Sequence, residues 1–190
     1  MGEFADRVNA IKVQVVSPDN NIHVVLQGEG DITVEFRPKS YPQYSERGLE
    51  HQIERAATLV YTGYYKAYGH LMNEFDRNLK RGPDDARDPT EREYLTDRAE
   101  LQVVGATERK AVRVKATGLY RWECRIAEGT LAELSEQEFL DELHGAIRNF
   151  LARYRTRMSV LFAKHYGSED RKRLLELLRK QDSRFNKEPS

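Results

Sequence analysis

Val13-Gln14-Val15-Val16, near the start of the chain, recurs as Leu101-Gln102-Val103-Val104 in the second half. The two segments are 88 residues apart, and the same shift aligns Val24 with Val112. Internal similarity at a fixed separation is typical of a repeated structural unit. We therefore expect this chain of 190 residues to contain one unit twice.

The second part of each copy aligns at a shift of 90 instead of 88. Ser45-Glu46 then meets Ser135-Glu136, and Tyr64 meets Tyr154. Apolar positions coincide at this shift as well, so the helical periodicity is preserved between the copies. The change of shift predicts two extra residues in the second copy, between its strands and its helix.

Alternating apolar residues predict three strands in each copy, within residues 11–37 and 99–126. In the first copy Ile32, Val34 and Phe36 alternate with polar residues, which is typical of a half-buried strand. Asx, proline and glycine residues separate the strands and favour chain reversal. The expected inward positions of the last strand in the second copy are Tyr120, Trp122, Cys124 and Ile126.

A long amphipathic helix is expected after each set of strands, starting near residues 46 and 136. Ser135 and Glu138 have the spacing of a capping box at the second start. A helix over residues 46–76 would be about 45 Å long, which exceeds what a three-stranded sheet can cover. Part of each helix must therefore pack elsewhere, and the other copy is the expected partner.

These elements predict an α+β fold of two tandem units, each a three-stranded antiparallel meander followed by a long helix. Short leading helices are expected at Phe4 to Val8 and from Asp88-Pro89, and a C-terminal helix after Gly167. The predicted boundaries are 1–80 for the first repeat, 81–90 for a linker, 91–167 for the second repeat and 168–190 for the C-terminal helix and tail.

This order of elements resembles the YbaB/EbfC family of bacterial nucleoid-associated proteins. The strand blocks 11–37 and 99–126 and the helices that begin near Leu49 and Phe139 carry the resemblance, which covers most of the chain. Members of that family are homodimers that bind DNA with little sequence preference. The resemblance implies that the tandem chain is a fused pseudo-dimer with a DNA-binding role. The fusion, the leading helices and the C-terminal extension depart from the family pattern.

No motif for catalysis or metal binding occurs in the sequence, so we expect neither an enzyme nor a cofactor. The five histidines are dispersed along the chain. The single cysteine, Cys124, is expected to be a small core residue and not a reactive thiol. Acidic pairs such as Glu50 and Glu54 on the first long helix are interpreted as part of a solvated face.

Charge is unevenly distributed although the chain is neutral overall. Residues 1–97 carry 12 Lys/Arg and 17 Asp/Glu, whereas residues 98–190 carry 19 and 14. Outward positions on the second copy's strands would form one basic cluster, and a helical segment without acidic residues would form another. The predicted binding residues are Arg113, Lys115, Arg121, Arg125, Arg148, Arg153, Arg155 and Arg157. In the first copy the 88-residue shift puts Val25, Gln27, Thr33 and Arg37 opposite the strand cluster.

Two functions remain open at this point. Basic clusters and the family resemblance favour non-specific DNA binding. Zero net charge favours a protein-interaction or scaffold module that recognises an acidic partner. The first residues lack the basic and apolar regions of a signal peptide, and no apolar run has the length of a bilayer span, so we expect a cytoplasmic protein of the nucleoid that contacts no membrane. It would be a monomeric pseudo-dimer or a further dimer of one.

Overall fold

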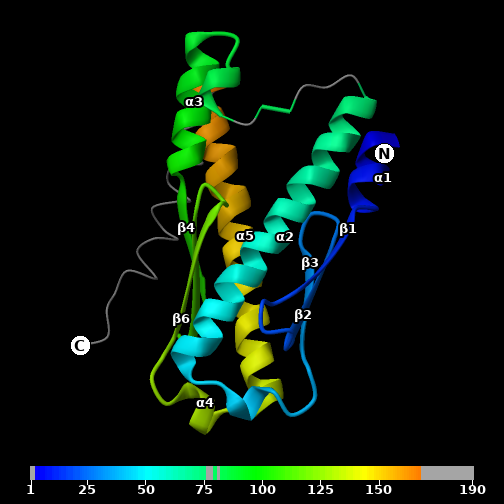
Figure 1. The fold of residues 1–190 in the computed structure, drawn as a ribbon. Helices are drawn as coiled ribbons and strands as arrows, with labels where there is room; N and C mark the ends of the chain where they lie inside the picture. The colour runs from blue at the N-terminus through cyan, green and yellow to red at the C-terminus, as the bar shows by residue number, and fades with distance from the viewer. Residues whose placement is uncertain (1–2, 76–78, 81, 168–190) are drawn as a thin grey trace, which may run out of the picture. The chain divides into compact units, whose positions relative to one another are not determined.

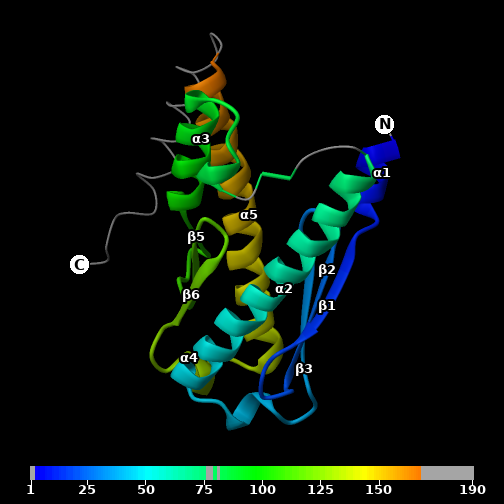
Figure 2. The same ribbon diagram turned by 45° about the horizontal axis from the view of Figure 1, so that its top comes forward.

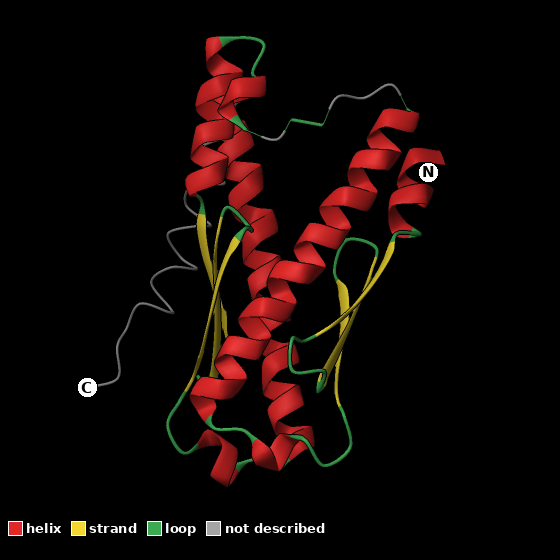
Figure 3. Ribbon diagram, viewed as in Figure 1, coloured by secondary structure: helices red, strands yellow, loops and turns green. Residues whose placement is uncertain are grey.

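A computed structural model describes residues 3–75, 79–80 and 82–167, and it confirms the predicted α+β fold class (Figure 3). Each copy contributes one antiparallel sheet with its strands in sequence order. Sheet A contains β1 (Lys12–Val16), β2 (Ile22–Gln27) and β3 (Asp31–Phe36), and sheet B contains β4 (Gln102–Ala106), β5 (Val112–Thr117) and β6 (Arg121–Ile126). The long helices are α2 (Glu46–Glu74) and α5 (Glu136–Tyr166).

The two short leading helices lie where the sequence predicts them, near Phe4 to Val8 and after Asp88, and the other short helices of the described residues were not predicted. The short helices are α1 (Glu3–Asn9), η1 (Tyr41–Gln43), η2 (Pro83–Asp85), α3 (Pro89–Glu100) and α4 (Thr130–Glu133). Asp88 caps α3, because its carboxylate accepts a hydrogen bond from the Glu91 amide at 2.8 Å. The predicted capping box of α5 is confirmed, since Glu138 Oε2 accepts from the Ser135 amide at 2.8 Å. The helix predicted after Gly167 lies outside the described residues.

A single shift of 90 residues relates the two sheets, so the predicted shift of 88 over the strands is wrong. Lys12 pairs with Gln27 in sheet A, and Gln102 pairs with Thr117 in sheet B. The hairpin turns set this register, because Gly28 and Gly118 have φ angles of +58° and +60°. The Val-Gln-Val-Val match reflects strand composition, and it places residues two positions out of register.

Each long helix covers the edge strand of the other copy's sheet. Helix α2 contacts β1 and β2 of its own sheet and also β6 of sheet B (Figures 1 and 2). Glu54 Oε1 accepts from the Cys124 amide at 2.9 Å, and Glu50 Oε1 accepts from the Ile126 amide at 2.8 Å. On the other side, His144 of α5 accepts from an amide of β3. The expected packing of each helix against the other copy is therefore confirmed.

The chain divides into two compact units. Unit 1 comprises residues 1–79 and 102–151, and unit 2 comprises residues 80–101 and 152–190. In unit 1 both repeats contribute to one core, with Ile22, Leu49, Val112 and Phe139 each at most 1% exposed. In unit 2 the Asp97 carboxylate of α3 hydrogen-bonds His165 Nε2 of α5 at 2.8 Å. None of the helices in the described ranges is long and apolar enough to span a bilayer.

Candidate nucleic-acid interface

Strands β5 and β6 display four basic side chains on the face of sheet B that lies away from the core. Buried residues alternate with them, because successive side chains of a strand point to opposite faces. We call this surface the basic face and define it as Arg113, Lys115, Arg121, Glu123 and Arg125. Four basic residues and one acidic residue give the basic face a net charge of +3. The outward orientation predicted for the four bases is thus present in the structure.

Cross-strand pairing brings like charges together on the basic face. Arg113 lies directly opposite Arg125 in the β5–β6 ladder, and such like-charged neighbours destabilise a sheet. Lys115 lies opposite Glu123, and their ion pair measures 2.9 Å. Lys115 also lowers the pKa of the Glu123 carboxyl through this hydrogen bond. The basic face therefore combines one satisfied ion pair with one unfavourable arginine pair.

Two carboxylates of α2 partly balance Arg125. Its Nη1 lies 3.6 Å from Glu50 Oε2 and 3.6 Å from Glu54 Oε1, yet 65% of the side chain remains exposed. The two glutamate side chains are only 15% and 25% exposed, so interpreting them as a solvated face was wrong. They accept hydrogen bonds from the β6 backbone, and this long-range contact has no local sequence signal. Burial, and then the charges of Glu50 and Glu54, raise the pKa of the Cys124 thiol to about 12. This agrees with the predicted role of Cys124 as a core residue.

The counterpart face of sheet A carries the opposite charge. With the 90-residue shift its positions are His23, Val25, Asp31, Thr33 and Glu35. It holds two acids and no lysine or arginine. Choosing Val25, Gln27, Thr33 and Arg37 as the counterparts was wrong, because that choice used the 88-residue shift. The contrast between the two sheets is larger in the structure than the sequence alignment implied.

The predicted helix arginines are distributed over both units. Arg148 is exposed and lies in unit 1, in the same unit as the basic face. Arg155 is exposed and Arg157 is half-buried, and both belong to unit 2. Arg153 is buried, with 7% of its surface exposed. Of the eight predicted binding residues, the four on the basic face and Arg148 therefore belong to unit 1. Arg153 is too buried to contact a partner.

The β5–β6 hairpin ends in an exposed aromatic residue. Tyr120 is 48% exposed, so its predicted inward position is wrong. The reason is the turn: Gly118 and Leu119 have φ angles of +60° and +64°, and β6 begins only at Arg121. The alternation seen along β6 therefore does not extend to Tyr120. The Arg121 guanidinium carbon lies 5.8 Å from the centre of the Tyr120 ring.

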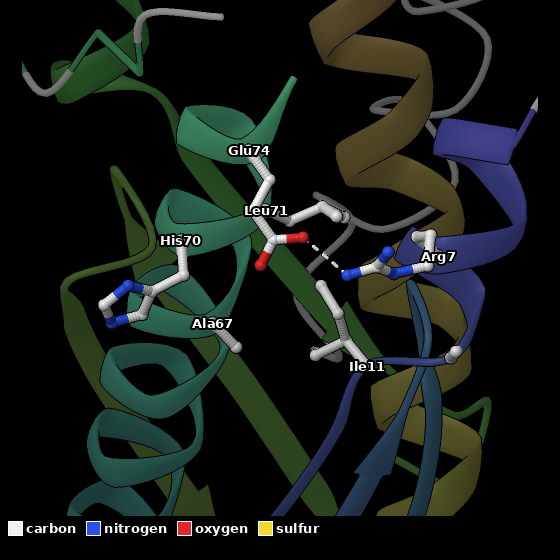
Figure 4. Close-up of a pocket in the computed structure, with 7 residues that line it drawn as sticks. Arg7, Ile11, Ala67, His70, Leu71 and Glu74 are labelled. Atoms are coloured by element: carbon white, nitrogen blue, oxygen red, sulfur yellow. Dashed lines mark hydrogen bonds and ion pairs between the residues drawn. The ribbon is translucent and has the colours of Figure 1, made fainter. Parts of the chain in front are cut away.

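A small hollow lies between α2 and the segment formed by α1 and the two residues that follow it (Figure 4). Its volume is about 200 Å³, below the range of roughly 300–1,000 Å³ typical of ligand pockets. The lining residues are Arg7, Ala10, Ile11, Ala67, His70, Leu71 and Glu74. Arg7 and Glu74 form an ion pair at 2.6 Å beside it. In the described part of the chain, no three His, Cys, Asp or Glu residues gather as metal ligands would.

The comparisons with known proteins add no assignment to this geometry. No protein-family model, no curated protein and no solved structure matches the chain. The resemblance to the YbaB/EbfC family accordingly remains a prediction from the order of the elements.

Proposed function

We propose that the protein binds DNA non-specifically through the basic face of sheet B, as a nucleoid-associated protein of the YbaB/EbfC type built as a fused pseudo-dimer. The observation that supports this is the Arg113–Arg125 cross-strand pair. A like-charged pair opposes folding, and the equivalent pair in sheet A, His23–Glu35, has no such repulsion. A ligand with closely spaced negative charges would relieve the repulsion when it binds. The phosphates of DNA are such a ligand.

Recognition of an acidic protein is the second candidate. The ion pairs of Lys115 with Glu123 and of Arg125 with two glutamates favour it, because mixed charges are common where two proteins meet. The two candidates differ in their expected dependence on salt. Each neutralised phosphate releases counterions, and the DNA affinity therefore falls with a logarithmic slope of about −0.9 per contact.

The first prediction is a measurable salt slope for duplex DNA. Three to four phosphate contacts would lower the association constant by about 40- to 150-fold between roughly 50 and 200 mM salt. Fluorescence anisotropy with two duplexes of unrelated sequence measures this dependence directly. Equal affinity for the two duplexes is expected, since contacts to phosphates do not read the bases.

Charge reversal at the basic face is the matched test. Arg113→Glu with Arg121→Glu should weaken duplex binding more than about tenfold and reduce the salt slope by about two contacts. Arg37→Glu with Lys39→Glu changes the net charge equally but lies outside the basic face, and should alter affinity far less. Arg113→Glu should leave the unfolding free energy at least at the parental value, because it replaces a repulsive pair by an attractive one.

Equal effects of both double variants would show that net charge alone governs binding, which contradicts a defined face. Parental protein without salt-dependent DNA binding would overturn the proposal and favour an acidic protein partner. Because the reversals are on exposed side chains, loss of affinity together with retained stability separates a binding defect from misfolding.

A further inference from the structure

The hairpin tip that joins β2 to β3 differs in chemistry from the tip that joins β5 to β6. In sheet A the tip reads Gly28-Glu29-Gly30, and in sheet B it reads Gly118-Leu119-Tyr120. The 90-residue shift therefore puts Tyr120 where the first repeat has a glycine. One tip presents an acid, and the other presents an aromatic ring next to the basic face.

The backbone of the second tip is a tight turn that holds Tyr120 in position. The Tyr120 amide donates to the Thr117 carbonyl at 3.3 Å, and both intervening residues have positive φ. Glycine or asparagine is usual at such positions, whereas Leu119 adopts φ of +64°. A bulky residue seldom adopts this conformation. The turn therefore keeps an unfavourable residue and places the tyrosine immediately before β6.

The surroundings of Tyr120 are those of a site for a base beside a phosphate. Nearly half of its surface is exposed, at 48%, and Arg121 lies alongside the ring at 5.8 Å. Arg121 belongs to the basic face, and Thr117 lies opposite it in the ladder. Proteins that bind single strands combine a basic track for the backbone with aromatic rings on which bases stack.

We infer that the tip Leu119-Tyr120-Arg121 is a stacking site for an unpaired base, so that the basic face binds single-stranded nucleic acid more tightly than duplex. This inference rests on the proposed function and specifies its ligand. Bases in a duplex stack on one another, and their faces are not available to a side chain at the groove. An unpaired base can leave its neighbours and stack on Tyr120 while Arg121, Arg113 and Lys115 contact the phosphates. Stacking does not depend on base identity, so binding stays sequence-tolerant.

The test uses the full chain and a labelled oligothymidylate of about 16 nucleotides, compared with a duplex of equal length. Tyr120→Ala should weaken single-strand binding by about tenfold, within the range of roughly 5- to 150-fold typical of one stacked base. Tyr120→Phe keeps the ring and should stay within about twofold of the parent. Glu29→Ala, at the equivalent tip of sheet A, is the matched control and should have no effect.

The outcomes separate this inference from the proposed function. Salt-dependent binding of both ligands, with Tyr120→Ala equal to the parent on the single strand, would overturn the stacking site and leave DNA binding intact. Equal loss on single strand and duplex would also overturn it, since stacking acts only on the unpaired ligand. Absence of salt-dependent binding to either DNA would refute both proposals.

Discussion

The outer faces of the two sheets have the same strand register and opposite charge. Where sheet B pairs Arg113 with Arg125, sheet A pairs His23 with Glu35. Where Arg121 ends the sheet B hairpin, Asp31 ends that of sheet A. Packing restricts the inner faces, which are apolar in both repeats. The solvent-facing positions have no such restriction, so they show how a duplicated framework can acquire one binding surface instead of two.

The edge strands β3 and β6 also differ in the side chains that accept hydrogen bonds from their backbones. Two glutamates of α2 hydrogen-bond the β6 backbone, whereas one histidine of α5 accepts from β3: His144 Nε2 lies 3.2 Å from the Val34 amide. His144 is 90 residues after Glu54, and Cys124 is 90 residues after Val34. The position equivalent to Glu50 is Leu140, which has no acceptor. Sheet B is thus held by charged acceptors, and sheet A by a neutral one.

The largest effect is expected from removing the acceptors at sheet B. Glu50→Ala with Glu54→Ala leaves the Cys124 and Ile126 amides without their partners and should lower the unfolding free energy by about 2–6 kcal/mol. His144→Ala removes one acceptor at sheet A and should cost about 1–3 kcal/mol. Urea denaturation of the two variants and the parent measures both losses.

Glutamine variants provide the control for this comparison. Glu50→Gln with Glu54→Gln keeps a side-chain oxygen at each position, so most of the parental stability should be retained. If the alanine variants were as stable as the glutamine variants, the helix–edge hydrogen bonds would contribute nothing. The two sheets would then differ only in the charges of their outer faces and not in the stability of their edges.

The fold was predictable from the sequence because its signals are local. Alternation in Ile32, Val34 and Phe36 marks a strand, and Ser135 with Glu138 marks the start of a helix. The correct shift was also visible, since Gly28 and Gly118 are 90 residues apart, as are Ser45 and Ser135. The three identities between Val13–Val16 and Leu101–Val104 favour the wrong shift, because valine-rich strands match one another by chance.

The candidate site was only partly predictable. Alternation alone placed Arg113, Lys115, Arg121 and Arg125 on one face. The edge contacts of Glu50, Glu54 and His144 depend on which helix crosses which strand, and a charge-rich helix contains many similar glutamates. Tyr120 was misplaced because the turn interrupts the alternation. Arg153 lies seven residues after Ala146 and three after Phe150, on the buried stripe of α5, so its helical spacing indicated burial although its charge suggested a surface position.

The edge of sheet A should respond to mildly acidic pH through His144. Burial, and then Arg148, lower the pKa of His144 from its ordinary value of 6.5, with Asp141 acting in the opposite direction. The folded state therefore favours the neutral ring, whose Nε2 accepts from Val34. Its contribution to stability is complete above about pH 6.5 and is lost as the pH falls toward the lower pKa of the folded state. The loss should appear as a lower unfolding free energy at mildly acidic pH than at neutral pH.

Urea midpoints of the parent and of His144→Gln, measured from neutral to mildly acidic pH, isolate this contribution. Glutamine has a carbonyl acceptor that does not titrate, so the variant should be less sensitive than the parent in this window. Parallel pH profiles would show that His144 does not hold the β3 edge through its neutral ring. All other titrating groups are common to both proteins and cancel in the difference.

Transfer of the basic pattern from sheet B to sheet A tests most directly whether face charge carries the function. In the Arg113→Glu, Arg121→Glu background, the changes His23→Arg, Asp31→Arg and Glu35→Arg give sheet A three arginines at the positions equivalent to Arg113, Arg121 and Arg125. We predict that duplex affinity returns to within about tenfold of the parent, with a salt slope of about three contacts. Binding that stays as weak as in the double-reversal background, in a protein of unchanged stability, would contradict the account.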